Sequence, residues 1–153
     1  MNEEVKIERA RKEDSETLTE LTLRSMNYWS YGEEQIEKWR SKLTISSKYI
    51  EEKELYKLTI SNNLIGFYSY EEEKSKVAKL NYLFVEPTYI GNGYGKLLMN
   101  NFLNQLKKQK YEKVLLDSDP NAEKFYQYFG FKTKGKLETS IPGRFLSMMY
   151  LDI

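Results

Sequence analysis

The chain has 153 residues, carries 24 Lys and Arg against 23 Asp and Glu, and contains neither histidine nor cysteine. The absence of cysteine excludes a thiol nucleophile, a thiolate metal site and disulfides. The absence of histidine excludes an imidazole base, a Ser-His-Asp triad and histidine-ligated zinc. Any catalysis must therefore use carboxylates, lysine, tyrosine, hydroxyl or backbone groups, or a bound cofactor.

The size and charge of the chain predict one domain over residues 1–153, without a membrane or nucleic-acid partner. This length is enough to bury a core, and the net charge of +1 argues against a general nucleic-acid-binding protein. No apolar run approaches the roughly 18 residues of a membrane span. The segment MNEEVKIERA lacks the apolar stretch of a signal peptide. We expect a cytoplasmic monomer or homodimer.

The first half of the chain predicts a strand, two helices, a short helical turn and an antiparallel meander. Val5 and Ile7 alternate with polar residues in a first strand, and Asp14 is expected to cap a helix that runs to about Met26. The following segments are expected next: a helix from Glu33 to Trp39 or Leu43, a turn from Ser46 or Ser47 through Ile50, strands Leu55–Ile60 and Leu64–Tyr70 joined by a turn at Ser61–Asn63, a charged turn at Glu71–Ser75, and a strand Val77–Val85.

The second half predicts an α/β arrangement with a βαβ crossover. A helix is expected to follow a glycine cluster and to run to about Gln109, because apolar residues recur in it at helical spacing. A short helix capped by Asp119–Asn121 is expected to end at Gly130. The strands expected around these helices are Val114–Leu116, Phe131–Lys136 and Phe145–Leu151.

The segment Gly91–Gly95, between a strand and a helix, predicts an anion-binding site. The first N–H groups of a helix have no internal partner, and the helix dipole adds about +0.5 charge there. This helix has no acidic residue in its first two turns and carries Lys96 in the first, which opposes the dipole unless an anion binds. The other helices begin with acidic residues: Asp14 and Glu16, Glu33 and Glu34, Asp119 and Glu123. The alternative is that the glycines only form a tight turn.

The segment from Leu83 to Leu98, LFVEPTYIGNGYGKLL, resembles the GNAT (GCN5-related N-acetyltransferase) superfamily. Its hallmark is a strand that ends in V-x-P, a basic or Gln residue, then G-x-G-x-G and a helix. The order of strands and helices is similar over nearly the whole chain. The resemblance implies a single GNAT domain with a mixed central sheet of about six to seven strands and helices on both faces.

The resemblance also implies that acetyl-CoA is the co-substrate. The loop N–H groups would hold its pyrophosphate, and the strand end would pair with its pantetheine. Ile90 stands where the family usually has Arg or Gln, so Lys96 is the residue expected to compensate in part. The residues implied for cofactor binding are Leu83, Phe84, Val85, Gly91, Asn92, Gly93, Tyr94, Gly95, Lys96 and, from a second motif, Asn121.

The segment Asn121–Phe131 is similar to the second GNAT motif, N-x-A-x-x-F-Y-x-x-x-G-F. In the family the Asn contacts the cofactor, and the Tyr is a general acid near the sulfur. Amine attack on a thioester expels a thiolate, to which a phenol with a reference pKa near ~10 can donate. Tyr126 is therefore the expected catalytic residue. The alternatives are that Tyr126 belongs to the core and that Asn121 caps its helix.

The general base is not evident, because Lys79, Asn81 and Tyr82 occupy the strand region where many family members have a Glu. A water chain is one alternative. The backbone N–H groups near Phe84 are suited to binding the thioester carbonyl. The candidate carboxylates, each also explained as a helix cap or a solvated charge, are Glu33, Glu34, Asp117 and Asp119.

An aromatic cluster in the early helices is the candidate acceptor pocket, with packing on the core as the alternative. Arg144 follows a Pro-Gly turn and is a candidate ligand for an acceptor carboxylate or a cofactor phosphate, or an exposed turn residue. Together the segments WSYG, SDPNAE and IPGR resemble a GNAT subgroup of uncharacterised acetyltransferases. The aromatic cluster is Tyr28, Trp29, Tyr31 and Trp39, and the substrate candidates are Tyr28, Trp29, Tyr31, Glu33 and Arg144.

The resemblance to the GNAT superfamily implies an acetyl-CoA-dependent N-acetyltransferase that acts on a primary amine of an unknown small molecule or peptide. Transfer is expected to be direct, in a ternary complex, because no thiol exists to carry an acetyl group. No metal is expected. The alternatives are a non-catalytic acyl-CoA-binding module of the same fold and a nucleotide-binding protein that uses the glycine loop.

Overall fold

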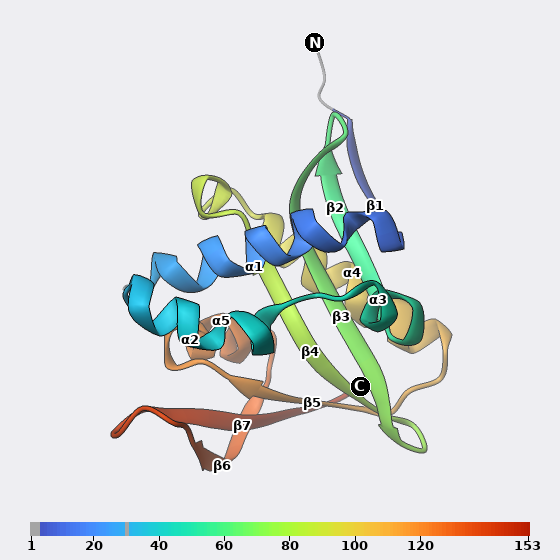
Figure 1. Ribbon diagram of the computed structural model, residues 1–153. Helices are drawn as coiled ribbons and strands as arrows, with labels where there is room; N and C mark the ends of the chain where they lie inside the picture. The colour runs from blue at the N-terminus through green and yellow to red at the C-terminus, as the bar shows by residue number, and fades with distance from the viewer. Residues whose placement is uncertain (1–3, 30) are drawn as a thin grey trace. The chain divides into compact units, whose positions relative to one another are not determined.

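The computed structural model describes residues 4–29 and 31–153, which form a seven-stranded sheet in the order β1-β2-β3-β4-β5-β7-β6 (Figure 1). The strands are β1 Val5–Arg9, β2 Glu54–Ile60, β3 Asn63–Lys74, β4 Val77–Val85, β5 Lys113–Ser118, β6 Lys132–Glu138 and β7 Phe145–Asp152. The helices are α1 Ser15–Tyr28, α2 Glu33–Leu43, α3 Ser47–Glu52, α4 Tyr94–Lys108 and α5 Glu123–Tyr128, with 3-10 turns η1 Lys12–Asp14, η2 Pro87–Tyr89 and η3 Pro120–Ala122. The parallel β4–β5 pair and the antiparallel β1–β2, β2–β3, β5–β7 and β6–β7 pairs confirm the predicted mixed α/β sheet and its βαβ crossover.

The chain divides into two compact units. The first comprises Met1–Tyr70 and Tyr82–Leu103, and the second comprises Glu71–Asn81 and Asn104–Ile153. The strands β3 and β4 and the helix α4 contribute residues to both. The glycine cluster therefore belongs to the first unit, and Tyr126 belongs to the second.

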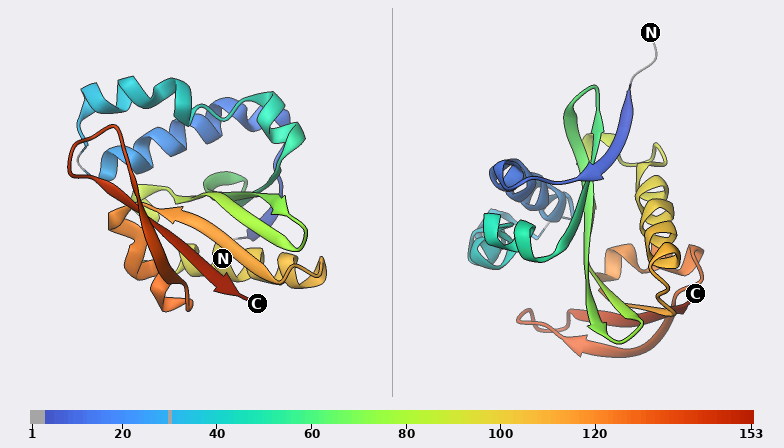
Figure 2. Two further views of the ribbon diagram at one scale, coloured as in Figure 1. Left: turned by 90° about the horizontal axis from the view of Figure 1, so that it is seen from below. Right: turned by 90° about the vertical axis from the view of Figure 1, so that its right-hand side faces the viewer.

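In the first unit, β3 is buried on both faces. Phe67 and Tyr68 are adjacent, so they point to opposite faces of the sheet, and both are fully buried. The helices α1 to α3 cover one face and α4 covers the other, as predicted (Figure 2). Tyr68 packs on Phe102 of α4 with ring centres 5.3 Å apart and donates a hydrogen bond to Oδ1 of Asn101 at 2.6 Å. The core on the other face consists of Ala10, Leu18, Leu21, Ile45, Ile50, Leu55 and Phe67.

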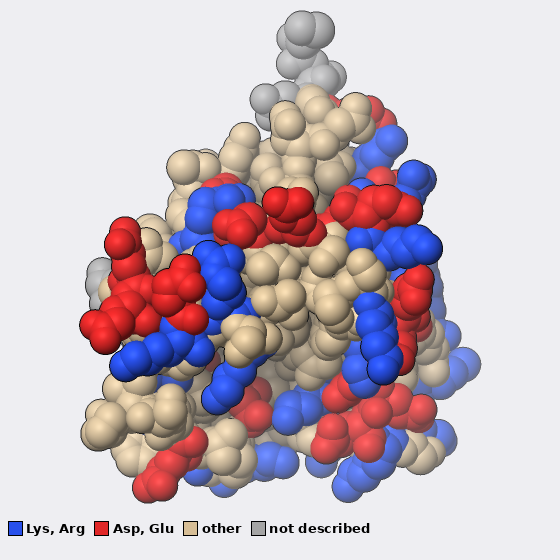
Figure 3. Space-filling model, viewed as in Figure 1, with Lys and Arg blue, Asp and Glu red and all other residues tan. Residues whose placement is uncertain are grey.

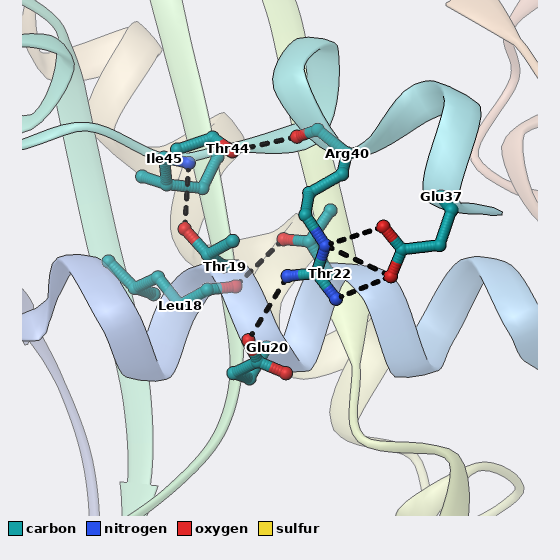
Figure 4. Close-up of polar contacts among 8 residues, drawn as sticks. All are labelled: Leu18, Thr19, Glu20, Thr22, Glu37, Arg40, Thr44 and Ile45. Atoms are coloured by element: carbon teal, nitrogen blue, oxygen red, sulfur yellow. Dashed lines mark hydrogen bonds and ion pairs between the residues drawn. The ribbon is translucent and has the colours of Figure 1, made fainter.

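Polar contacts hold α2 and the segment after it against α1 (Figure 4). The backbone N–H of Ile45 donates to the hydroxyl of Thr19 at 2.9 Å. Arg40 of α2 contacts Glu37 of its own helix at 3.2 Å and Glu20 of α1 at 3.5 Å. Acidic and basic side chains also lie beside one another over the outer face of these helices (Figure 3). Opposite charges are therefore interspersed on this face.

In the second unit, β7 lies between β5 and β6 and pairs antiparallel with both. Val77–Lys79 of β4 pair in parallel with Lys113–Leu115 of β5. Met149 of β7 is fully buried, and Tyr126 and Phe131 are buried at the end of α5 and just beyond it. The rings of Tyr126 and Phe131 pack edge to face with centres 5.8 Å apart, which ties α5, the carrier of the second sequence motif, to the residue just beyond it.

Two local expectations are wrong. Glu71–Lys74 do not form a charged turn but continue β3, and the chain turns at Ser75 and Lys76, where Lys76 has φ 63°. Charged side chains are compatible with this strand end because it is exposed. Asp14 precedes α1 but does not cap it, because the turn η1 directs its carboxylate to the N–H of Arg11 at 2.8 Å and to Nζ of Lys57 at 2.9 Å.

Candidate functional site

The glycine loop of the first unit has the backbone conformation that the sequence predicts for an anion site. Gly91 and Gly93 have φ values of 92° and 85°, which side chains rarely allow. A Cβ added to either residue would meet no atom within 4 Å, so the loop is uncovered on that side. Leu97 N donates to Gly93 O at 3.1 Å, and the N–H groups that precede it in α4 have no carbonyl four residues earlier within the helix.

The charges at the start of α4 differ from those of the other long helices. The first turn of α4 contains no acidic residue and carries Lys96, whereas α1 has Glu16 and α2 has Glu33 and Glu34 in theirs. The loop is braced by the amide of Asn92, which donates to the carbonyl of Tyr89 at 3.2 Å. A braced loop at a helix start, where the first N–H groups have no partner within the helix and a lysine adds positive charge, can bind a phosphate through its backbone.

The end of β4 leads directly into this loop through η2. Leu83, Phe84 and Val85 are half-buried. The backbone of β4 comes very close to β3, because a Cβ added to Gly66 would lie 2.9 Å from the carbonyl oxygen of Phe84. Gly66 was not among the predicted site residues, although an isolated glycine within a strand pattern indicates such a close approach.

Tyr126 in the second unit is buried, with 8% of its surface exposed. Its ring makes edge contacts with Phe125, with centres 5.3 Å apart, and with Phe131, with centres 5.8 Å apart. Burial raises the pKa of the Tyr126 phenol above its usual value, and the nearby charge of Asp119 raises it further. The phenol therefore stays protonated at neutral pH and is available as a hydrogen-bond donor.

Asp119 connects the turn before α5 to the loop between β6 and β7. Its Oδ1 accepts hydrogen bonds from the backbone N–H and from the side-chain amide of Asn121, both at 2.9 Å. Its Oδ2 accepts from a terminal nitrogen of Arg144 at 2.6 Å, and the two side chains are only 19% and 14% exposed. Asp119 therefore caps η3, and Asn121 lies inside that turn. Asn121 does not cap α5 as the alternative predicted, because Ala122 holds the N-cap position of α5 and its side chain makes no capping hydrogen bond. Arg144 is not an exposed turn residue. The roles of Asn121 and Arg144 as cofactor and substrate contacts stay predictions.

The candidate bases each have another partner or a surface position. Asp117 lies 3.2 Å from Nζ of Lys79, and Asp119 is bound to Arg144. Glu33 and Glu34 are exposed in the first turn of α2. No carboxylate in the described part of the chain stands out as a base, and the assignment stays open.

The aromatic residues of the early helices form two pairs. Tyr28 and Trp29 are exposed and make an edge contact with ring centres 4.8 Å apart. Tyr31 and Trp39 are half-buried, with centres 5.1 Å apart. Ser30, part of the same motif, lies outside the described residues. The exposed pair is not core packing, so the acceptor hypothesis remains for Tyr28 and Trp29.

Among residues 4–29 and 31–153, no three His, Cys, Asp or Glu residues are grouped so as to hold a metal ion. Over the same ranges, no helix is both long and apolar enough to cross a membrane.

Comparison with known proteins identifies a family and a relative for part of the chain. The family model described as acetyltransferase (GNAT) domain matches residues 27–150. The uncharacterized N-acetyltransferase ycf52 of Gracilaria tenuistipitata var. liui is 28% identical over 92 residues, which are 60% of this chain and 50% of that protein. The chain thus spans about half the length of this curated relative.

Two solved structures have a similar fold. The PaiA N-acetyltransferase of Thermoplasma acidophilum, solved in complex with coenzyme A, superposes with a TM-score of 0.83 at 24% identity, over 98% of this chain and 99% of that one. The ribosomal-protein-S18-alanine N-acetyltransferase of Escherichia coli superposes with a TM-score of 0.75 at 17% identity, over 98% and 94%. These likenesses support the fold, and the family model covers both sequence motifs, so the chain belongs to the GNAT acetyltransferase family.

Proposed function

We propose that the chain is an acetyl-CoA-dependent N-acetyltransferase that moves an acetyl group to a primary amine of a small molecule or a peptide. The glycine loop carries this proposal: Gly91 and Gly93 precede α4 with positive φ angles and open space at their Cβ positions, at a helix start without acidic residues. Membership of the GNAT family supports the pyrophosphate of acetyl-CoA as the anion. A cytoplasmic location stays a prediction.

In this proposal the first unit binds the cofactor mainly through its backbone. The N–H groups of Gly91–Gly95 and the side chain of Lys96 hold the phosphates. The backbone of Leu83–Val85 pairs with the pantetheine. Support for this pairing comes from the β4–β5 ladder, which covers Val77–Lys79 and so ends before these residues. Asn121 is proposed as a further cofactor contact.

Tyr126 stabilises the departing thiolate in this proposal. The amine nitrogen bonds to the carbonyl carbon, the carbon–sulfur bond breaks, and the phenol donates its hydrogen bond to the sulfur. Because the pKa of Tyr126 is raised, the phenol holds its proton firmly. We therefore assign it hydrogen-bond donation to the thiolate, with the proton lost by the amine passing to water and finally to sulfur. Transfer is direct, because the chain has no cysteine to carry the acetyl group.

Replacing Tyr126 by Phe tests the catalytic part of the proposal. We expect kcat to fall by about 100-fold, in the range typical of a lost hydrogen-bond donor to a developing negative charge, while the affinity for CoA measured by calorimetry stays within about twofold, since ring packing is kept. Tyr128→Phe is the matched control, because Tyr128 is on the same helix and 68% exposed. It should leave kcat unchanged. Equal activity of Tyr126→Phe and wild type would remove Tyr126 from the mechanism.

The second candidate is a non-catalytic acyl-CoA-binding module. The observation that favours it is the pairing of Asp117 with Lys79 and of Asp119 with Arg144, which leaves no evident base in the described residues. A broad amine panel separates the two functions. Tight CoA binding without acetyl transfer to any amine would support the module, and ATP binding as strong as acetyl-CoA binding would contradict both.

A further inference from the structure

Helix α1 holds the end of β4 by a paired ionic contact in the first unit. Nε and a terminal nitrogen of Arg24 donate to the two carboxylate oxygens of Glu86 at 2.8 and 2.7 Å. This two-point geometry fixes orientation as well as distance. The Glu86 side chain is 17% exposed, so the pair is partly shielded from water. The same hydrogen bond is the largest contribution that raises the pKa of Arg24.

Two further hydrogen bonds hold Val85, the last residue of β4, and Glu86, the residue after it. The hydroxyl of Ser25, the next residue of α1, donates to the carbonyl of Val85 at 3.2 Å. The backbone N–H of Glu86 donates to the carbonyl of Ile65 in β3 at 2.7 Å. We call Arg24, Ser25, Val85 and Glu86 the α1–β4 clasp. The backbone of Glu86 is therefore held by β3, and its side chain is held by α1.

The clasp lies between the two backbone segments proposed to bind acetyl-CoA. Leu83–Val85 end at it, and the glycine loop begins at Gly91, a few residues after it. The connection is short and internally bonded: Tyr89 N donates to Glu86 O at 2.8 Å, and Ile90 N donates to Pro87 O at 3.2 Å. A shift of Glu86 is therefore transmitted to the loop with little opportunity for relaxation.

We infer that the α1–β4 clasp is a positioning device for the cofactor, in which Arg24 and Glu86 hold the exit of β4 and the glycine loop in the geometry that binds the pyrophosphate. This inference rests on the proposed function. Arg24 and Glu86 touch no reacting atom in it, so they are positioning residues. Their effect is preorganisation: a loop that is already ordered loses less conformational entropy when a ligand binds.

Arg40 provides a matched comparison within the same unit. Like Arg24, it is a partly exposed arginine on a helix of this layer with carboxylate partners, but those partners belong to α1 and α2 (Figure 4). Loss of Arg24 removes its contact with Glu86, and loss of Arg40 removes its contacts with Glu20 and Glu37. The two arginine side chains are 50% and 46% exposed, so a similarly modest effect on stability is expected from either loss. Only the loss of Arg24 is expected to affect the loop.

The test compares Arg24→Gln, Glu86→Gln, the double variant and Arg40→Gln. We expect each single clasp variant to weaken CoA binding about fivefold by calorimetry, with a raised KM for acetyl-CoA and nearly unchanged kcat. The double variant should bind no more weakly than either single one, because both changes break the same contact. The exchanged pair Arg24→Glu/Glu86→Arg should recover part of the affinity, and Arg40→Gln should bind as wild type.

A second measurement keeps the inference independent of catalysis. Amide hydrogen exchange at Gly91–Lys96 in the absence of ligand should be about fivefold faster in Arg24→Gln than in Arg40→Gln, at comparable thermal midpoints. Unchanged exchange and unchanged CoA affinity in Arg24→Gln would overturn the clasp. Additive losses in the double variant would do the same. Failure of wild type to bind CoA would instead overturn the proposed function, and the exchange rates would still decide whether the clasp orders the loop.

Discussion

The glycine loop in the first unit offers backbone groups, whereas the surroundings of Tyr126 in the second unit consist of side chains that bind one another. The loop depends on the backbone angles of Gly91 and Gly93. The second site depends on one carboxylate, Asp119, which accepts hydrogen bonds from Asn121 and Arg144. An added Cβ should therefore damage the first site, and a removed charge should damage the second.

Asp119→Ala should have the largest effect on stability, a loss of about 3 kcal/mol. It removes the acceptor that holds the turn before α5, and it leaves the poorly exposed Arg144 without this partner. Urea unfolding measures the loss. Asp152→Ala is the control, because Asp152 lies 3.6 Å from Lys113 in an exposed pair and should change stability very little. Similar losses in the two variants would show that Asp119 does not connect the two segments.

Gly66→Ala should cost about 2 kcal/mol, because the new Cβ would lie 2.9 Å from the backbone oxygen of Phe84 and β4 would have to shift. The same shift should weaken CoA binding. Gly135→Ala is the comparison in the second unit, where the new Cβ would meet the flexible end of Met148 at 2.8 Å. That side chain can move aside, so a loss below about 1 kcal/mol is expected. Urea unfolding measures the loss of stability in both variants. A larger loss for Gly135→Ala than for Gly66→Ala would contradict this prediction.

Gly93→Ala should weaken CoA binding about tenfold, because an alanine at a φ of 85° is strained and the loop would relax to another conformation. Calorimetry with CoA measures this. Gly32→Ala is the matched control: Gly32 has φ 88° and open space around its Cβ position, but it precedes α2. It should lose similar stability and keep its CoA affinity. If both variants bind CoA as wild type does, the loop is only a tight turn.

The two motifs were predictable from the sequence because each is local. The glycines of Gly91–Gly95 predict a turn with positive φ angles before a helix. The spacing in Asn121–Phe131 places Tyr126 on the apolar face of α5. Most strands and helices were predictable for the same reason. The wrong turn at Glu71–Ser75 arose because charged residues suit a loop and an exposed strand end equally well.

The contacts between distant segments were not predictable. Arg24 and Glu86 are 62 positions apart, and Asp119 and Arg144 are 25 apart, so no local pattern connects either pair. In the sequence, Glu86 is only the middle residue of a V-x-P motif, and Arg144 is a candidate ligand after a turn with nothing to indicate Asp119 as its partner. Tertiary packing brings each pair together, and each pair then orders the motif beside it.

The smallest predicted effect is a pH dependence of folding stability, which distinguishes the buried Tyr126 from the exposed Tyr128 on the same helix. In the unfolded chain a phenol ionises near pH ~10, whereas burial and Asp119 raise the pKa of Tyr126 in the folded state. The unfolded state therefore loses this proton first, so the stability from Tyr126 is fully present below pH ~10 and decreases as the pH rises further. The share of Tyr126 in this decrease is about half a kcal/mol at pH 10.

Urea unfolding from pH 8 to 11 measures this share as the difference between wild type and Tyr126→Phe, which cannot ionise at that position. Lysines also titrate in this range, and they cancel in the difference. Tyr128→Phe removes one hydroxyl from the exposed side of α5, so it is the control for losing a tyrosine hydroxyl that is not buried. A wild-type decrease that Tyr126→Phe reproduces unchanged would contradict the buried, protonated phenol, because its hydroxyl would then have the same proton affinity in both states.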